Sequence, residues 1–123
     1  MAGIVFFETQ KLEEITEFYT STLGLKIWLE QKGCTILSHG NLLLGFCQRN
    51  NAETEGMITL FYKTPKKVDQ IYEKIQHLAN TEPRKNDVYN IYQFFGKDPE
   101  GRDLEFQAFL HDLKPLEIED FLK

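Results

Sequence analysis

The chain repeats itself once at an offset of 53 residues, and this repeat constrains the fold more than any other feature. The paired positions are apolar in both copies: Val5 and Ile58, Phe7 and Leu60, Ile15 and Val68, Phe18 and Ile71, Tyr19 and Tyr72. One copy has little against which to bury its helix, so a stable fold needs both. The repeat therefore predicts two similar modules within the 123 residues.

Each copy reads as one strand, one helix and three further strands. In the first copy Gly24 follows a helical pattern, and Gly40-Asn41 fits a two-residue hairpin turn with glycine first. In the second, Thr64 and Pro65 form a helix start. The predicted helices are 11–24 and one that begins at Pro65; the predicted strands are 3–9, 25–31, 34–39, 42–48, 57–63, 81–85, 90–96 and 102–109.

This order predicts an α+β fold. The two β-α-β-β-β modules are expected to form a curved mixed sheet around a cavity, with both helices on its outer face. We treat residues 1–123 as a single domain, with module one at about 1–50 and module two at about 56–110. The tail, 111–123, can form a terminal helical turn that carries Leu116, Phe121 and Leu122.

Composition narrows the range of partners. The chain has 14 Lys and Arg residues against 19 Asp and Glu residues, which gives a formal net charge of −5. Because no basic run with interleaved aromatics is present, we expect neither nucleic acid nor an anionic membrane as a partner. The sequence shows no signal-peptide pattern and no apolar run near the roughly 18 residues of a membrane span, so we expect a cytoplasmic protein.

The stretch "DPEGRDLEFQAF" at 98–109 combines a turn with a strand. Pro99 and Gly101 favour a turn, and Asp98 can accept hydrogen bonds from its backbone. The strand that follows alternates, with Leu104 on one face and Glu105 on the other. A carboxylate in so apolar a strand is a candidate functional group.

This stretch, together with "FYTSTLGLKI" after the first helix and the duplicated module, resembles the vicinal oxygen chelate superfamily. That group includes glyoxalase I, extradiol dioxygenases and the bleomycin and fosfomycin resistance proteins. The resemblance covers nearly the whole chain. It implies a cavity, four metal-ligand positions on strands in the metal-dependent members, and homodimers among members of one-domain length.

Carried over position by position, the resemblance places the four ligand positions at Ile4, Leu44, Met57 and Glu105, with Ile58 or Thr59 as the alternatives to Met57. Leu44 follows from aligning Gly40 with Gly101, an offset of 61. Aliphatic side chains have no donor atom and a thioether is a soft ligand, so one carboxylate remains where a catalytic site needs about three ligands. We therefore expect no metal, no cofactor and no assigned catalytic residue.

Cys34 and Cys47 are predicted to lie opposite each other. If Gly40-Asn41 is the turn, paired positions sum to 81, and these two positions satisfy that sum. Both thiols would lie on the face opposite to Leu44, which we expect the helices to cover. They are therefore predicted to be buried, apolar-like cysteines, with a redox pair as the alternative. Two cysteines are too few for a disulfide framework.

The candidate ligand-binding residues surround Glu105. By strand parity, four aromatic side chains are expected on its side of the sheet, with Gln107 nearby and Glu8 near the cavity rim. Aromatic walls suit a planar or cationic guest. Glu105 has three open interpretations: a ligand-contacting carboxylate, a group that only hydrogen-bonds neighbouring strands, or part of a displaced metal site. The candidate set is Glu105, Trp28, Phe46, Phe61, Phe94, Gln107 and Glu8.

These observations predict a metal-free small-molecule-binding protein of the glyoxalase/bleomycin-resistance type, with an aromatic or cationic ligand in a cleft. The alternative is a metal-dependent lyase or dioxygenase of the same superfamily with displaced ligands, such as Glu105, Glu8 and a histidine like His39. Whether the protein is an enzyme stays open at this point, as does an interaction domain whose cavity has collapsed.

Overall fold

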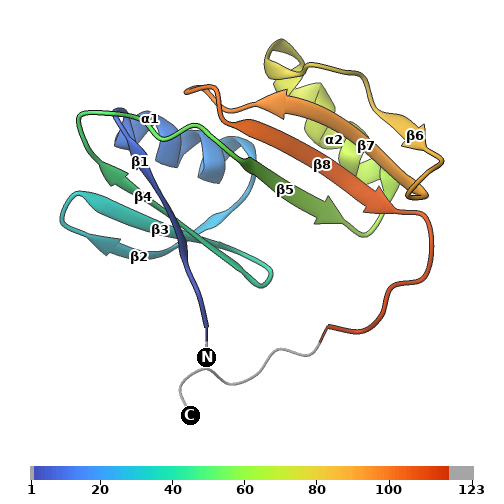
Figure 1. Ribbon diagram of the computed structural model, residues 1–123, viewed down its shortest axis with the longest axis horizontal. Helices are drawn as coiled ribbons and strands as arrows, with labels where there is room; N and C mark the ends of the chain where they lie inside the picture. The colour runs from blue at the N-terminus through green and yellow to red at the C-terminus, as the bar shows by residue number, and fades with distance from the viewer. Residues whose placement is uncertain (1, 117–123) are drawn as a thin grey trace. The chain divides into compact units, whose positions relative to one another are not determined.

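The computed structural model describes residues 2–116, which form two compact units (Figure 1). The first unit comprises the chain up to Glu53 together with the segment from Lys114 onward, and the second spans Thr54–Leu113. Each unit contains one four-stranded mixed sheet and one α-helix, so the α+β prediction and the two-module organisation are confirmed. The predicted helical turn of the tail reaches residues 117–123, which lie outside the described residues.

In the first unit the strand order is β1-β4-β3-β2, and β1 runs parallel to β4. Gly40 has a φ of +56° and opens the two-residue turn between β3 and β4, as the sequence predicts. The elements are β1 (Val5–Thr9), α1 (Leu12–Glu17), the π-helix η1 (Phe18–Thr22), β2 (Lys26–Gln31), β3 (Cys34–His39) and β4 (Leu42–Gln48).

The predicted helix of residues 11–24 is divided into two geometries. After α1 the chain widens into η1, where the Leu23 amide donates to the Phe18 carbonyl at 3.1 Å. Gly24, with a φ of +84°, then ends the segment. The apolar spacing predicted where the helix lies, but not its change of winding.

The second unit repeats the arrangement, with strand order β5-β8-β7-β6 and β5 parallel to β8. Thr64 caps α2, as predicted: its side-chain oxygen accepts from the Lys67 amide at 3.4 Å. The elements are β5 (Met57–Tyr62), α2 (Pro65–Ile75), the 3₁₀-helix η2 (Gln76–Leu78), β6 (Arg84–Asn86), β7 (Ile91–Lys97) and β8 (Asp103–Phe109). Among residues 2–116, no helix is long and apolar enough to cross a membrane.

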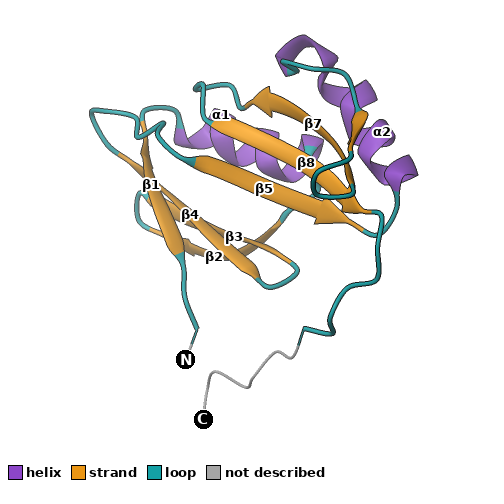
Figure 2. Cartoon of the chain, turned by 45° about the vertical axis from the view of Figure 1, so that its right-hand side comes forward, coloured by secondary structure: helices purple, strands orange, loops and turns teal. Residues whose placement is uncertain are grey.

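Each helix packs on one face of the sheet in its own unit, which Figure 2 shows for α2. In the first unit the ring of Tyr19 lies 5.0 Å from that of Phe46. In the second, Tyr72 meets Phe94 at 5.2 Å, and Phe94 stacks on Phe106 at 4.8 Å. The aromatic core of each unit therefore lies between its helix and its sheet, and the opposite sheet face is left for other contacts.

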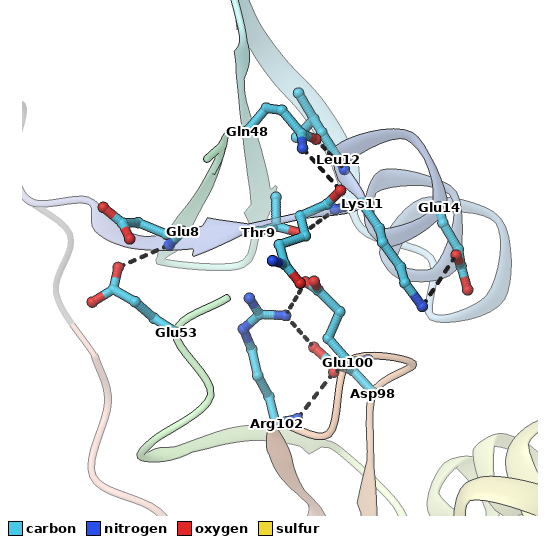
Figure 3. Close-up of polar contacts among 11 residues, drawn as sticks. Glu8, Thr9, Lys11, Leu12, Glu14, Gln48, Glu53, Asp98, Glu100 and Arg102 are labelled. Carbon is cyan, nitrogen blue, oxygen red and sulfur yellow. Dashed lines mark hydrogen bonds and ion pairs between the residues drawn. The ribbon is translucent and has the colours of Figure 1, made fainter. Parts of the chain in front are cut away.

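A buried cluster of charges fixes the turn between β7 and β8 (Figure 3). Arg102 Nη1 lies 3.1 Å from Asp98 Oδ2 and 2.9 Å from Glu100 Oε1. Asp98 Oδ1 also accepts from the backbone amides of Glu100 and Arg102. Burial alone would lower the pKa of Arg102, but its hydrogen bonds to the two carboxylates raise it. The turn prediction for Asp98 is thus confirmed, and Gly101 adopts a φ of +92°.

A tyrosine on β7 joins the second sheet to its helix. Tyr92 donates from its hydroxyl to Asp69 Oδ1 at 2.7 Å, and this bond, reinforced by burial, raises the pKa of Tyr92 to about 12. We expect Tyr92→Phe to lower the free energy of unfolding by about 1 kcal/mol at neutral pH, because one hydrogen bond is lost. Urea unfolding followed by circular dichroism measures this change.

The same substitution has a pH signature. The pKa of Tyr92 is higher in the folded state than its unfolded value of about 10. Its contribution to the free energy of unfolding is therefore complete below pH 10 and is lost as the pH rises towards 12. Tyr62, whose pKa burial also raises to about 12, contributes in the same window. Tyr92→Phe is therefore expected to lose less stability between pH 10 and 12 than the unmodified protein; an equal loss would contradict this assignment.

Candidate ligand-binding site

Glu105 lies in the middle of β8, on the sheet face opposite to α2. Its Oε1 accepts from the Thr59 hydroxyl on β5 at 2.9 Å, and its Oε2 accepts from the Gln93 side-chain amide on β7 at 3.1 Å. The carboxylate is half-buried, and Gln93 is buried. One donor on each oxygen holds the carboxylate in place and leaves each oxygen able to accept again.

The polar contacts continue to the edge of the sheet. Asn86, on β6, donates from its side-chain amide to Gln93 Oε1 at 3.1 Å. Its own oxygen accepts from the backbone amides of Val88 and Tyr89, which lie in the exposed turn before β7. Thr59, Glu105, Gln93 and Asn86 therefore form one connected network across all four strands, which we call the Glu105 network.

Aromatic side chains border this network on the same face. Phe61 lies two residues after Thr59 on β5 and pairs with Gln107 across to β8. Its ring meets that of Phe109 edge to face at 5.4 Å, and Phe109 meets His111 at 5.5 Å. Phe61 is 49% exposed, so a large apolar surface is presented close to a fixed negative charge. This combination can hold a guest that carries N–H donors and a flat apolar part.

Metal binding has less support from the described residues. Across residues 2–116, no group of three or more His, Cys, Asp or Glu side chains is placed to hold a metal ion. The partners of Glu105 are a hydroxyl and an amide, which are weak ligands for borderline divalent metals such as Zn²⁺. The arrangement fits hydrogen bonding better than metal ligation.

Two of the predicted site aromatics lie on the other sheet faces. Phe94 pairs with Phe106 and contacts Tyr72, so the prediction that it shares the side of Glu105 is wrong. Phe46 contacts Tyr19 and is fully buried beneath the helical segment of the first unit. Both rings belong to the cores. For Phe94 the prediction failed because the pairing of β7 with β8 sets Phe95, not Phe94, beside Glu105. Phe61, Gln107 and Glu105 do share one face, as predicted.

The register of the repeat also differs by one residue from the prediction. Val5 pairs with Leu44, whereas its repeat equivalent Ile58 pairs with Leu104. The offset between β4 and β8 is therefore 60, and the counterpart of Glu105 is Gly45 rather than Leu44. The Phe6 ring lies against Gly45, where it would collide with any Cβ added there. The conclusion that this position offers no ligand is unchanged.

The remaining candidates, Glu8 and Trp28, lie in the first unit. Glu8 pairs with Cys47 on β4, and its amide donates to Glu53 Oε1 at 2.8 Å (Figure 3). Trp28 is 48% exposed at a register shift in the edge strand β2. Within this unit, a cavity of about 770 Å³ also lies beside α1, lined by Leu12, Glu13, Thr16, Glu17, Thr20, Ser21, Glu30, Gly33, Thr35 and Gln48.

Cys34 and Cys47 are opposite each other, as predicted, but they form a disulfide. They lie on the face of β4 that does not carry Phe46, and therefore away from the helix. The prediction that they are buried free thiols under the helices is wrong, because the face of Leu44 and Phe46, not the opposite one, is the helix-covered face.

Sequence reasoning missed Gln93 and Asn86, and it named Thr59 only as an alternative to Met57. Thr59 could have been found from the parallel pairing of first and last strands, which sets it beside Glu105. Gln93 and Asn86 have ordinary polar side chains on strands, and no spacing marks them. Only the pairing of β6 with β7 and of β7 with β8 brings them to the carboxylate.

Comparison with solved structures shows which known proteins share this fold. A glyoxalase/bleomycin resistance protein/dioxygenase family enzyme from Burkholderia phytofirmans PsJN superposes with a TM-score of 0.77 at 16% identity, covering 87% of this chain and 97% of that one. A glyoxalase/bleomycin resistance protein/dioxygenase from Nocardioides gives 0.70 at 18% identity, covering 97% and 89%.

A lactoylglutathione lyase from Agrobacterium tumefaciens gives a TM-score of 0.69 at 16% identity, covering 88% of this chain and 94% of that one. No protein-family model matches the chain, and no curated protein matches it in sequence. Similarity at this level of identity defines the fold. The chain thus has the two-module fold of the glyoxalase/bleomycin resistance protein/dioxygenase structures.

Proposed function

We propose that the protein binds a small organic cation with an aromatic or flat apolar part at the Glu105 network, without a metal ion. The observation that carries this proposal is the half-buried Glu105 carboxylate, held by Thr59 and Gln93 beside the half-exposed Phe61 ring. A protonated amine or amidine would donate to the free lone pairs of Glu105. Its flat part would lie against Phe61 and Phe109.

Titration calorimetry with a panel of aromatic amines and guanidines tests this function. Glu105→Gln keeps the size of the side chain and removes its charge, so we expect affinity to fall about tenfold to a hundredfold, as for a lost hydrogen bond to a charged group. Phe61→Ala is expected to weaken binding by roughly three- to tenfold. The matched control is Glu82→Gln, an exposed carboxylate of the same unit, which should bind as the unmodified protein does.

Two outcomes would contradict the proposal. One is no binding by any member of the panel; the other is equal loss of affinity in Glu105→Gln and Glu82→Gln. Circular dichroism of each variant separates loss of binding from loss of folding.

The rival function is a metal-dependent lyase or dioxygenase with displaced ligands. It is favoured by the similarity to a structure named as a lactoylglutathione lyase. Elemental analysis after incubation with Zn, Ni, Mn and Fe distinguishes the two. A stoichiometric metal that is lost in Glu105→Gln would favour the rival, whereas metal content well below one ion per chain would favour the metal-free binder.

We also propose that residues 1–123 act as one domain, that two copies associate as a homodimer, and that the protein works in the cytoplasm. The first two follow from the duplicated module and from the resemblance in fold. Sedimentation equilibrium measures the association directly, and a monomer at all concentrations tested would overturn the dimer.

A further inference from the structure

The first unit contains the cavity of about 770 Å³ beside α1, which we call the α1 cavity. Its walls come from α1 and η1 and from the strands β2, β3 and β4. The volume falls within the usual range for sites that bind small molecules. No residue of the Glu105 network lines this cavity, so a ligand bound here would use a different set of side chains.

The helical wall of the α1 cavity is fixed at both of its ends. Where α1 begins, the side-chain oxygen of Gln48 accepts from the Leu12 amide at 2.9 Å, and its nitrogen donates to the Gln10 carbonyl at 2.8 Å (Figure 3). Further along, the Thr20 hydroxyl donates to the Thr16 carbonyl at 2.7 Å. Because the wall is held in place before a ligand arrives, less entropy is lost on binding.

The ionisable side chains that line the α1 cavity are all acidic. Glu13 and Glu17 lie four residues apart on α1, and Glu30 lies on β2. The described residues of the lining include no lysine, arginine or histidine. Like charges four residues apart on a helix repel each other. A positively charged guest would relieve this repulsion.

The neighbouring lysines do not belong to this lining. Lys11 Nζ lies 3.9 Å from Oε2 of Glu14, and Lys11 lines a smaller adjacent cavity of about 480 Å³. Lys32 is exposed in the turn between β2 and β3. The lining of the α1 cavity itself thus carries three carboxylates and no cation.

Two hydroxyl groups in the walls have no partner within residues 2–116. Thr35, on β3, is only 7% exposed, pairs directly with Glu30 across the strands, and makes no side-chain hydrogen bond. Thr16 Oγ1, on α1, is buried and has no hydrogen-bond partner. A buried hydroxyl without a partner lowers stability. A guest with N–H donors would supply the partner that Thr35 lacks, next to the carboxylate of Glu30.

The carboxylates favour an extended guest over a single ion. Within the described part of the chain, no three His, Cys, Asp or Glu side chains are placed to hold one metal ion. Glu13 and Glu17 belong to the helical wall, whereas Glu30 belongs to the sheet. A flexible guest whose charges are spaced along its length can reach both walls. Leu12 offers its methylene groups an apolar contact.

We propose that the α1 cavity binds a linear aliphatic amine that carries two or more ammonium groups. One ammonium group pairs with Glu30 and donates to the Thr35 hydroxyl, and a second pairs with Glu13 and Glu17. The methylene chain between them lies against Leu12. This guest has no aromatic part, unlike the one proposed for the second unit.

Titration calorimetry of the full chain at low salt tests this site with three probes: 1,4-diaminobutane, n-butylamine and magnesium chloride. We expect the diamine to bind at the α1 cavity about fivefold more tightly than the monoamine, because it makes an additional ion pair. Magnesium is expected not to compete. Amide chemical shifts measured by NMR should change on diamine addition in α1 and at the start of β3.

Three variants separate the contacts. Glu30→Gln is expected to weaken diamine binding about threefold, as for an exposed ion pair. Thr35→Val should weaken it about tenfold, through loss of a hydrogen bond to a charged group. The free energy of unfolding of Thr35→Val should not fall, because the hydroxyl has no partner in the unbound chain. The control is Glu73→Gln, an exposed glutamate on α2, which should bind as the unmodified protein does.

The opposite results would overturn the proposal. Equal affinity for the diamine and the monoamine, or displacement of the diamine by magnesium, would mean that the cavity does not select spaced charges. Unchanged binding in Thr35→Val would remove the hydroxyl from the site. Loss of diamine binding in Glu105→Gln but not in Glu30→Gln would assign the amine to the Glu105 network instead. Circular dichroism of each variant confirms that it is folded.

Discussion

Replacing Arg102 by methionine is expected to lower the free energy of unfolding by about 3–5 kcal/mol. The side chains of Arg102 and Asp98 are 1% and 0% exposed, and that of Glu100 is 4% exposed. Removing the cation leaves two carboxylates in a buried turn without their main counter-charge. Most of the lost unfolding free energy is the desolvation penalty of the two unpaired carboxylates, and less of it is the lost attraction within the ion pairs. Chemical unfolding at pH 7 measures it.

A matched control lies in the same turn region. Lys97 Nζ is 2.6 Å from Asp103 Oδ1, a shorter contact, but the two side chains are 46% and 51% exposed. Lys97→Met is therefore expected to cost less than about 1 kcal/mol, since exposed ion pairs contribute little. If the two methionine variants were equally destabilised, burial would not be the deciding factor.

Phe106→Ala is the second substitution with a large expected effect, about 3–5 kcal/mol of unfolding free energy. Phe106 is fully buried, and its ring stacks on Phe94. Truncation leaves a cavity between β8 and the Phe94 ring that the sheet backbone cannot close. Thermal and urea unfolding both report the loss.

The control for Phe106→Ala is Phe61→Ala on the opposite face of the same sheet. Phe61 is 49% exposed and contacts Phe109 only edge to face, so its removal should cost about 1 kcal/mol. This pair also tests which sheet face forms the core. Equal costs would mean that the Glu105 side of the sheet is packed as tightly as the helix side.

The strands and helices could be predicted from the sequence because their periodicity is local. The Thr64 cap and the turn at Asp98 both depend on residues close in the chain. It was harder to predict which face of each sheet meets the helix. Phe94 and Phe95 are adjacent and both large, so alternation does not show which one meets the helix; the contact of Phe94 with Tyr72 decides it.

The register error has an equally physical cause. Gly40 and Gly101 were aligned because each lies in a predicted turn before a strand, and both do adopt positive φ. However, two residues separate β3 from β4, whereas five residues, Asp98 to Arg102, separate β7 from β8. The longer turn shifts the strand by one residue relative to its glycine, so Gly45, not Leu44, corresponds to Glu105. Turn length is set by the buried charges at Arg102, which glycine spacing does not reveal.

The ring of Phe6 against Gly45 has a consequence for how this chain could change over time. An acidic side chain at residue 45 would match Glu105 in the other module, but it would enter the space that Phe6 occupies. The aromatic ring must therefore be lost or turned outward before a carboxylate at this position becomes useful. A matching pair of carboxylates, one in each module, requires two substitutions, one at Phe6 and one at Gly45, because the change at Gly45 alone places its Cβ inside the Phe6 ring.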